Sequence, residues 1–125
     1  MRSKWILGVS LCILVGACAQ SPAPSVNITS GPFADGKEHR EPVFYNDHMY
    51  AVSYRFDAGA ATYLVRVTRE GRAMKPGAEG RKTAEAIATS SLSHFACPTK
   101  KRAKVLPGSL RHDGAGYDMR LRCGG

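Results

Sequence analysis

The sequence predicts an α+β domain in which an antiparallel sheet of about four strands carries one helix on one face. Two segments with alternating apolar and polar residues, 50–57 and 61–69, come first, and two more, 102–106 and 117–123, come last. Between them, residues 81–96 repeat their apolar positions at the helical period. This order, strand–strand–helix–strand–strand, favours two antiparallel hairpins whose shared apolar face is covered by the helix.

The first hairpin is the clearest part of the pattern. A turn that contains glycine, at residues 57–60, joins segment 50–57 to segment 61–69. The side chains expected to point inward are Tyr50, Val52, Tyr54, Phe56, Tyr63, Val65 and Val67. The preceding residues 33–49 contain a short apolar patch at 43–45, which fits either a strand or a loop packed on the core.

Residues 81–96 (RKTAEAIATSSLSHFA) are expected to form the helix. The stripe that faces the sheet consists of Ala84, Ile87, Ala88, Ser91, Leu92 and Phe95. Half of this stripe is alanine or serine, so the helix can lie close to the surface that it covers. Pro98 ends the helix, because a proline disfavours the helical conformation at the residue before it, Cys97.

The last two strands, 102–106 and 117–123, are separated by a turn at residues 107–109. Their inward residues are Ala103, Val105, Tyr117, Met119, Leu121 and Cys123. Because Cys123 points toward the helix and Cys97 follows the helix, the two are predicted to form a disulfide in an oxidising compartment. This bond would close a loop of about 27 residues and stabilise the domain by roughly 3–4 kcal/mol. A redox-active thiol is the alternative, although the chain has no C-x-x-C motif.

The start of the chain has the layout of a secretory signal. Arg2 and Lys4 precede an apolar run of 13 residues, which is too short for a membrane-spanning helix. The run ends in Val15-Gly16-Ala17-Cys18, which resembles the lipobox of bacterial lipoproteins. The resemblance implies that residues 1–17 are a signal peptide and that Cys18 becomes the lipidated first residue of the mature chain.

Lipid anchoring sets the expected organisation and location of the protein. Residues 18–32 would be the lipidated cysteine and an uncharged Ser/Pro linker, and residues 33–125 the folded domain. The residue after the cysteine is Ala19 rather than aspartate, which by the same resemblance implies the periplasmic face of the outer membrane. Residues 17–19 also fit ordinary A-x-A cleavage, which would instead release a soluble periplasmic protein.

Positive charge is the main functional signal of the mature chain. The formal net charge is +8, and it is still +6 without Arg2 and Lys4. Six basic residues at outward strand positions would share the uncovered face of the sheet: Arg55, Arg66, Arg102, Lys104, Arg120 and Arg122. We expect this face to bind lipopolysaccharide phosphates, peptidoglycan carboxylates or an acidic partner protein. The alternative is a solvated sheet face that its charge keeps soluble, and whose arginines also block edge-to-edge pairing. Nucleic acid is not expected, because the aromatic residues alternate inward.

The sequence contains no recognisable catalytic motif. The histidines are His39, His48, His94 and His112, and none of them belongs to a cluster at metal-ligand spacing. Nucleophile motifs and phosphate-binding glycine loops are also missing from the sequence. We therefore expect no enzyme, cofactor or metal, but a scaffold or accessory subunit of an envelope assembly. A small envelope hydrolase that uses scattered side chains such as His48 and His112 is the alternative.

Overall fold

The computed structural model describes residues 33–124. The expected signal peptide, the lipidation site Cys18 and the linker at 18–32 lie outside the described residues, as does Gly125. No helix within the described part is long and apolar enough to cross a bilayer.

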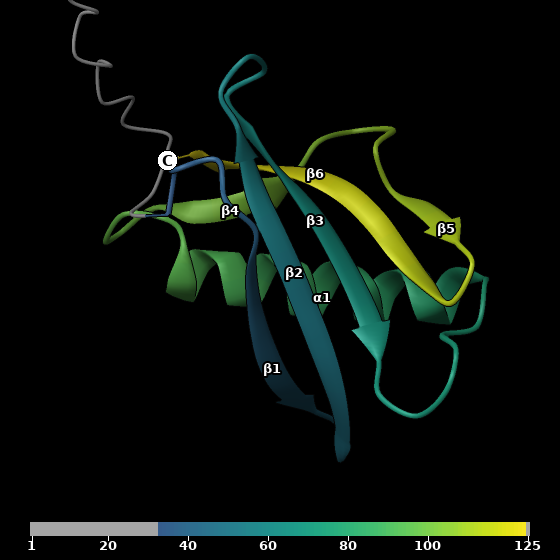
Figure 1. The fold of residues 1–125 in the computed structure, drawn as a ribbon. Coiled ribbons are helices and arrows are strands. Elements are labelled where there is room, and N and C mark those ends of the chain that lie inside the picture. The colour runs from purple at the N-terminus through teal and green to yellow at the C-terminus, as the bar shows by residue number, and fades with distance from the viewer. Residues whose placement is uncertain (1–32, 125) are drawn as a thin grey trace, which may run out of the picture.

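An antiparallel sheet with one helix on one face forms this part of the chain (Figure 1). Its elements are β1 (His39–Tyr45), β2 (His48–Asp57), β3 (Thr62–Arg69), α1 (Ala78–Phe95), β4 (Arg102–Val105), β5 (Arg111–Asp113) and β6 (Gly116–Gly124). The strand order is β1-β2-β3-β6-β4, and β5 pairs with the same edge of β6 as β4. The prediction of one helix on an antiparallel sheet is therefore confirmed, but the sheet has six strands rather than four.

The apolar patch at residues 43–45, which the sequence left open between strand and loop, belongs to strand β1. A two-residue turn, Asn46 and Asp47, joins it to β2. Both residues have positive φ (48° and 64°), as a type I′ hairpin turn requires, and their side chains tolerate this conformation. The most apolar side chain of the strand, Phe44, faces solvent, so an apolar pattern does not reveal the buried face of β1.

Strand β5 was not predicted at all. It pairs with the first half of β6, whereas β4 pairs with the second half, and residues 106–110 bulge out between them. Within this bulge, the Arg120 backbone N–H donates to Ser109 Oγ at 3.1 Å, and the Leu106 N–H donates to the Arg120 carbonyl at 2.9 Å. The bulge thus satisfies the β6 backbone where no strand pairs with it.

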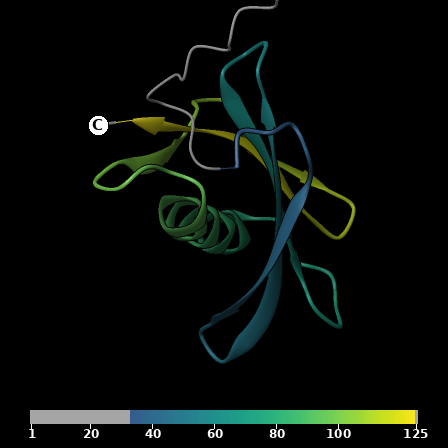
Figure 2. The same ribbon diagram turned by 60° about the vertical axis from the view of Figure 1, so that its left-hand side comes forward.

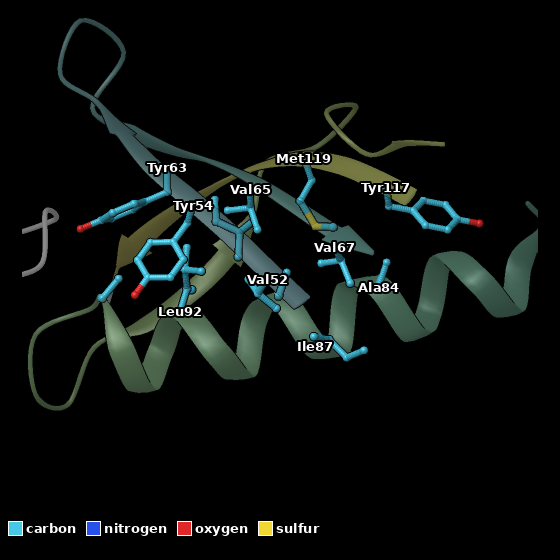
Figure 3. Close-up of a cluster of buried hydrophobic side chains, with 14 of the residues drawn as sticks. Val52, Tyr54, Tyr63, Val65, Val67, Ala84, Ile87, Leu92, Tyr117 and Met119 are labelled. Atoms are coloured by element: carbon cyan, nitrogen blue, oxygen red, sulfur yellow. The ribbon is translucent and has the colours of Figure 1, made fainter. Parts of the chain in front are cut away.

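The core lies between α1 and the sheet, as Figure 3 shows. Its most buried sheet residues, each at most 3% exposed, are Val52, Tyr54, Tyr63, Val65, Val67, Ala103, Tyr117, Met119, Leu121 and Cys123. From the helix, Ile87 and Leu92 enter the core together with the small residues Ala84 and Ala88. These small residues allow the helix to lie close to the strands. The predicted stripe is buried except for Phe95, which is partly buried.

The predicted disulfide between Cys97 and Cys123 is present, with a Cα–Cα distance of 5.4 Å. Cys123 is fully buried in β6, and Cys97 is 6% exposed just after the helix. The helix ends at Ala96, whose backbone N–H donates to the Leu92 carbonyl. The disulfide therefore ties the end of α1 to the strand that also carries Arg120.

Candidate functional site

A hollow of about 700 Å³ lies on the face of the sheet that points away from α1. Side chains of a strand alternate between the two faces of a sheet. Because Tyr54, Val65 and Met119 are buried in the core, their neighbours on β2, β3 and β6 point to the opposite face. Figure 2 shows α1 on one side of the curved sheet, and no second helix of residues 33–124 covers the other side.

The hollow has a floor and two walls. Ser53 of β2 and Leu64 of β3 form the floor. Glu38 and Arg40, at the beginning of β1, form one wall. The other wall is the bulge between β4 and β5, where Gly108 adopts a φ of 76°. The first wall comes from the segment that the sequence left open between strand and loop. The second comes from the predicted turn at 107–109, between the predicted strand β4 and the unpredicted strand β5.

Arginine is the main side chain of the lining: Arg40, Arg55, Arg66, Arg111 and Arg120 all contribute to it. Two of the five already have carboxylate partners. Arg66 Nη1 donates to Asp118 Oδ1 at 2.8 Å, and its Nη2 donates to the Asp113 carbonyl at 2.9 Å. Arg120 Nη1 donates to Asp57 Oδ2 at 3.2 Å and to Thr62 Oγ1 at 3.0 Å. The charges of these two guanidinium groups are therefore largely compensated.

The side chains of the other three arginines, Arg40, Arg55 and Arg111, are exposed and have no hydrogen-bond or ion-pair partner among residues 33–124. Glu38 is the one lining carboxylate that also has no such partner within this part of the chain. The hollow thus presents three uncompensated cations and one uncompensated anion. This balance favours an anionic ligand.

The predicted basic residues divide into two groups. Arg55, Arg66 and Arg120 line the hollow. The other three lie on β4 and the end of β6, outside the hollow, and are Arg102, Lys104 and Arg122. Lys104 and Arg122 face each other across these two strands. Arg40 lies on β1 and Arg111 lies on β5, and the sequence pattern did not assign either strand. The polar turn at Asn46 was the available signal for β1.

The pairing with Arg120 changes the acidity of Asp57. The hydrogen bond from the guanidinium group lowers the pKa of the Asp57 carboxyl below its ordinary value, and backbone N–H groups of the following turn lower it further. A carboxyl whose pKa is depressed in the folded state contributes stability above its unfolded pKa. That contribution disappears as the pH falls through the folded value.

We therefore expect Asp57→Asn to flatten the acid side of the stability profile. The wild type should lose free energy of unfolding below about pH 4, whereas the variant should lose less over the same range. Urea denaturation at a series of pH values measures this difference. Asp47→Asn, in the exposed β1–β2 turn, is the matched control and should follow the wild type. Parallel profiles for wild type and Asp57→Asn would contradict the prediction.

The histidines do not gather at the hollow. His39 bonds to Asp35 at 3.0 Å, His48 to Arg69 at 2.9 Å, and His112 to the Met74 carbonyl at 2.9 Å. Each of these contacts is local to a different part of the sheet. Among residues 33–124, no three His, Cys, Asp or Glu side chains are placed to hold a metal ion. None of the histidines lines the hollow.

Comparisons with protein-family models, with curated proteins and with solved structures found no match for this chain. Its function is therefore inferred from the residues of the hollow and from the N-terminal sequence.

Proposed function

We propose that this chain is a non-enzymatic lipoprotein that Cys18 anchors to the periplasmic face of the outer membrane. Its folded domain acts as a scaffold or accessory subunit and docks an anionic envelope component in the arginine hollow. The lipobox-like residues 15–18 support the anchor. The uncompensated guanidinium groups of the hollow support the docking role.

The observation that carries the docking role is the contrast between paired and unpaired arginines at one site. An arginine that only keeps a sheet face soluble can lie anywhere on that face, and an ion pair with a nearby carboxylate does not impair this role. Here Arg66 and Arg120 are held by aspartates, while Arg40, Arg55 and Arg111 surround the same hollow without partners in the described chain. The guanidinium group offers several N–H donors in a planar fork, which suits phosphate and carboxylate oxygens.

The size of the hollow agrees with this role. Pockets that bind small ligands have volumes of about 300–1,000 Å³, and this one measures about 700 Å³. Leu64 adds an apolar patch to its floor, and Ser53 adds a hydroxyl group. A phosphorylated or carboxylated group of moderate size can therefore enter and contact several arginines at once.

Removing the unpaired arginines tests the proposal. The mature lipidated protein, in neutral detergent, is titrated with inorganic tripolyphosphate and the heat of binding is measured. We expect the triple variant Arg40→Ala/Arg55→Ala/Arg111→Ala to lower the affinity at least about ten-fold, because charge-assisted hydrogen bonds are among the strongest polar contacts.

A second triple variant separates the hollow from general charge. Arg102→Ala/Lys104→Ala/Arg122→Ala removes the same charge from the other basic group and should change the affinity by less than about two-fold. Glu38→Gln, which removes the opposing carboxylate, should strengthen binding. An equal loss for both triple variants, or no loss for the first, would overturn the docking role.

A further inference from the structure

The face that bears the hollow continues toward the β1–β2 turn as an apolar strip. Cross-strand partners share a face of the sheet. Beside the hollow Arg40 pairs with Ser53, and the next pairs on the same face are Pro42 with Ala51 and Phe44 with Met49. The strip defined by these last two pairs carries no charged or hydrogen-bonding side chain.

Phe44 and Met49 are the large hydrophobic residues that residues 33–124 expose. Phe44 is 67% exposed and Met49 is 41% exposed. They lie side by side on neighbouring strands, so they form one apolar patch rather than two isolated side chains. Exposed apolar side chains that lie together are candidates for contact with a partner or a membrane.

The distance between the patch and the hollow limits the type of ligand. Arg40 and Phe44 are four residues apart on one strand, which corresponds to about 13 Å. A ligand that contacts both therefore needs an anionic group and, within about 13 Å, an apolar part. An anionic lipid in a bilayer has this chemistry, because its phosphate lies at the boundary of its acyl chains.

We propose that this face docks on a membrane surface that contains anionic phospholipid. A lipid phosphate occupies the hollow at Arg40, Arg55 and Arg111, and Phe44 and Met49 enter the boundary of the acyl chains. This inference rests on the proposed function and names its ligand class. A polysaccharide carboxylate would leave the apolar patch in water, which disfavours peptidoglycan as the ligand.

The attachment of the chain is compatible with this orientation. Strand β1 carries both Arg40 and Phe44, and it begins at His39, 21 residues after Cys18. A linker such as residues 19–32 can extend by about 3 Å per residue, which is enough for the sheet face to reach the membrane that holds the anchor.

The methionines of the mature chain provide a direct readout. The lipidated protein, labelled with ¹³C at its methionine methyl groups, is placed in nanodiscs that contain a spin-labelled lipid. In discs with phosphatidylglycerol, we expect the Met49 signal to broaden more strongly than those of Met74 and Met119, whose side chains belong to the core between the sheet and α1. In discs of phosphatidylcholine alone, all three signals should remain.

Variants of Phe44 separate this inference from the proposed function. Because Phe44 is exposed, Phe44→Ser should leave the fold intact, but it should lower the docked fraction about ten-fold and restore the Met49 signal. Phe44→Leu, which keeps an apolar side chain, should dock like the wild type. Tripolyphosphate binding should be unchanged in both.

The outcomes distinguish the two ideas. If Met49 keeps its signal in anionic discs while tripolyphosphate still binds, membrane docking is wrong and the anion site stands. If the wild type does not bind tripolyphosphate, the proposed function itself fails. Equal broadening in neutral and anionic discs would show that Phe44 and Met49 meet the bilayer without a role for the arginines, and would also overturn the inference.

Discussion

Replacing Cys97 and Cys123 together by alanine is expected to lower the free energy of unfolding by about 3–4 kcal/mol. The disulfide joins residues that are 26 positions apart, and it restricts the unfolded chain over that length. The folded state contributes a smaller loss, because both sulfur atoms lie in the core and alanine fills less of their space.

The effect is large relative to what the rest of the domain can supply. Folded domains have a net stability of only about 5–15 kcal/mol, and removing a native disulfide from a small secreted domain often abolishes folding at 37 °C. The variant should therefore be partly unfolded at 37 °C. The loss should be evident at the end of α1 and in β6, which the bond connects.

Urea denaturation of the mature lipidated protein, followed by circular dichroism, measures the change. Reducing agent should lower the midpoint of the wild type toward that of the double variant, and it should leave the variant unaffected. A double variant with the same midpoint as the oxidised wild type would contradict the assigned role of the bond.

The elements that the sequence predicted correctly are those whose side chains alternate cleanly between core and solvent. Strands β2, β3, β4 and β6 and the stripe of α1 have this property, and Cys123 lies inward as its position in the alternation required. Each of these elements is buried by direct contact between α1 and the sheet. Local patterning therefore contained the information needed to identify them.

Strand β1 could not be found in this way because each of its faces mixes apolar and polar side chains. Phe44 faces solvent, whereas Glu41 points toward the core side and accepts a hydrogen bond from the Tyr54 hydroxyl at 3.5 Å. Strand β5 consists of three exposed polar residues and exists through its pairing with β6. Each of these strands pairs with the next strand along the chain across a two-residue turn, and the periodicity of apolar residues does not indicate such pairing.

The candidate site was predictable only in part, for the same reason. Arg55, Arg66 and Arg120 belong to well-patterned strands, but the walls of the hollow come from β1 and the bulge beside β5. The sequence also could not show which arginines are neutralised. Asp57 reaches Arg120 across 63 residues of chain, and that contact exists only in the folded sheet.

The second large effect is expected at Gly80, in the first turns of α1. Alanine in place of glycine normally stabilises a helix by about 1 kcal/mol, but here we expect Gly80→Ala to destabilise the protein by about 2 kcal/mol. A Cβ atom at this position would collide with the Lys75 carbonyl and with the Tyr117 hydroxyl. These two groups are joined by a hydrogen bond of 2.6 Å, so neither can move away without breaking it.

Two further variants identify the collision as the cause. Gly59→Ala, in the β2–β3 turn, places its Cβ at ordinary contact distance and should change stability little. Tyr117→Phe removes the hydroxyl group that Gly80→Ala would meet. The double variant Gly80→Ala/Tyr117→Phe should therefore be less destabilised than the sum of the two single changes.

Urea denaturation of the wild type, Gly80→Ala, Tyr117→Phe and the double variant gives the coupling energy between the two positions directly. Additive losses would show that Gly80 and Tyr117 act independently, and a stabilised Gly80→Ala would show that helix propensity outweighs the close packing. The expected non-additive result would mean that the N-terminal end of α1 is held on the sheet by the contact of Gly80 with the Tyr117–Lys75 hydrogen bond. Together with the disulfide at the other end, this contact would fix the helix against the strands that carry the arginine hollow.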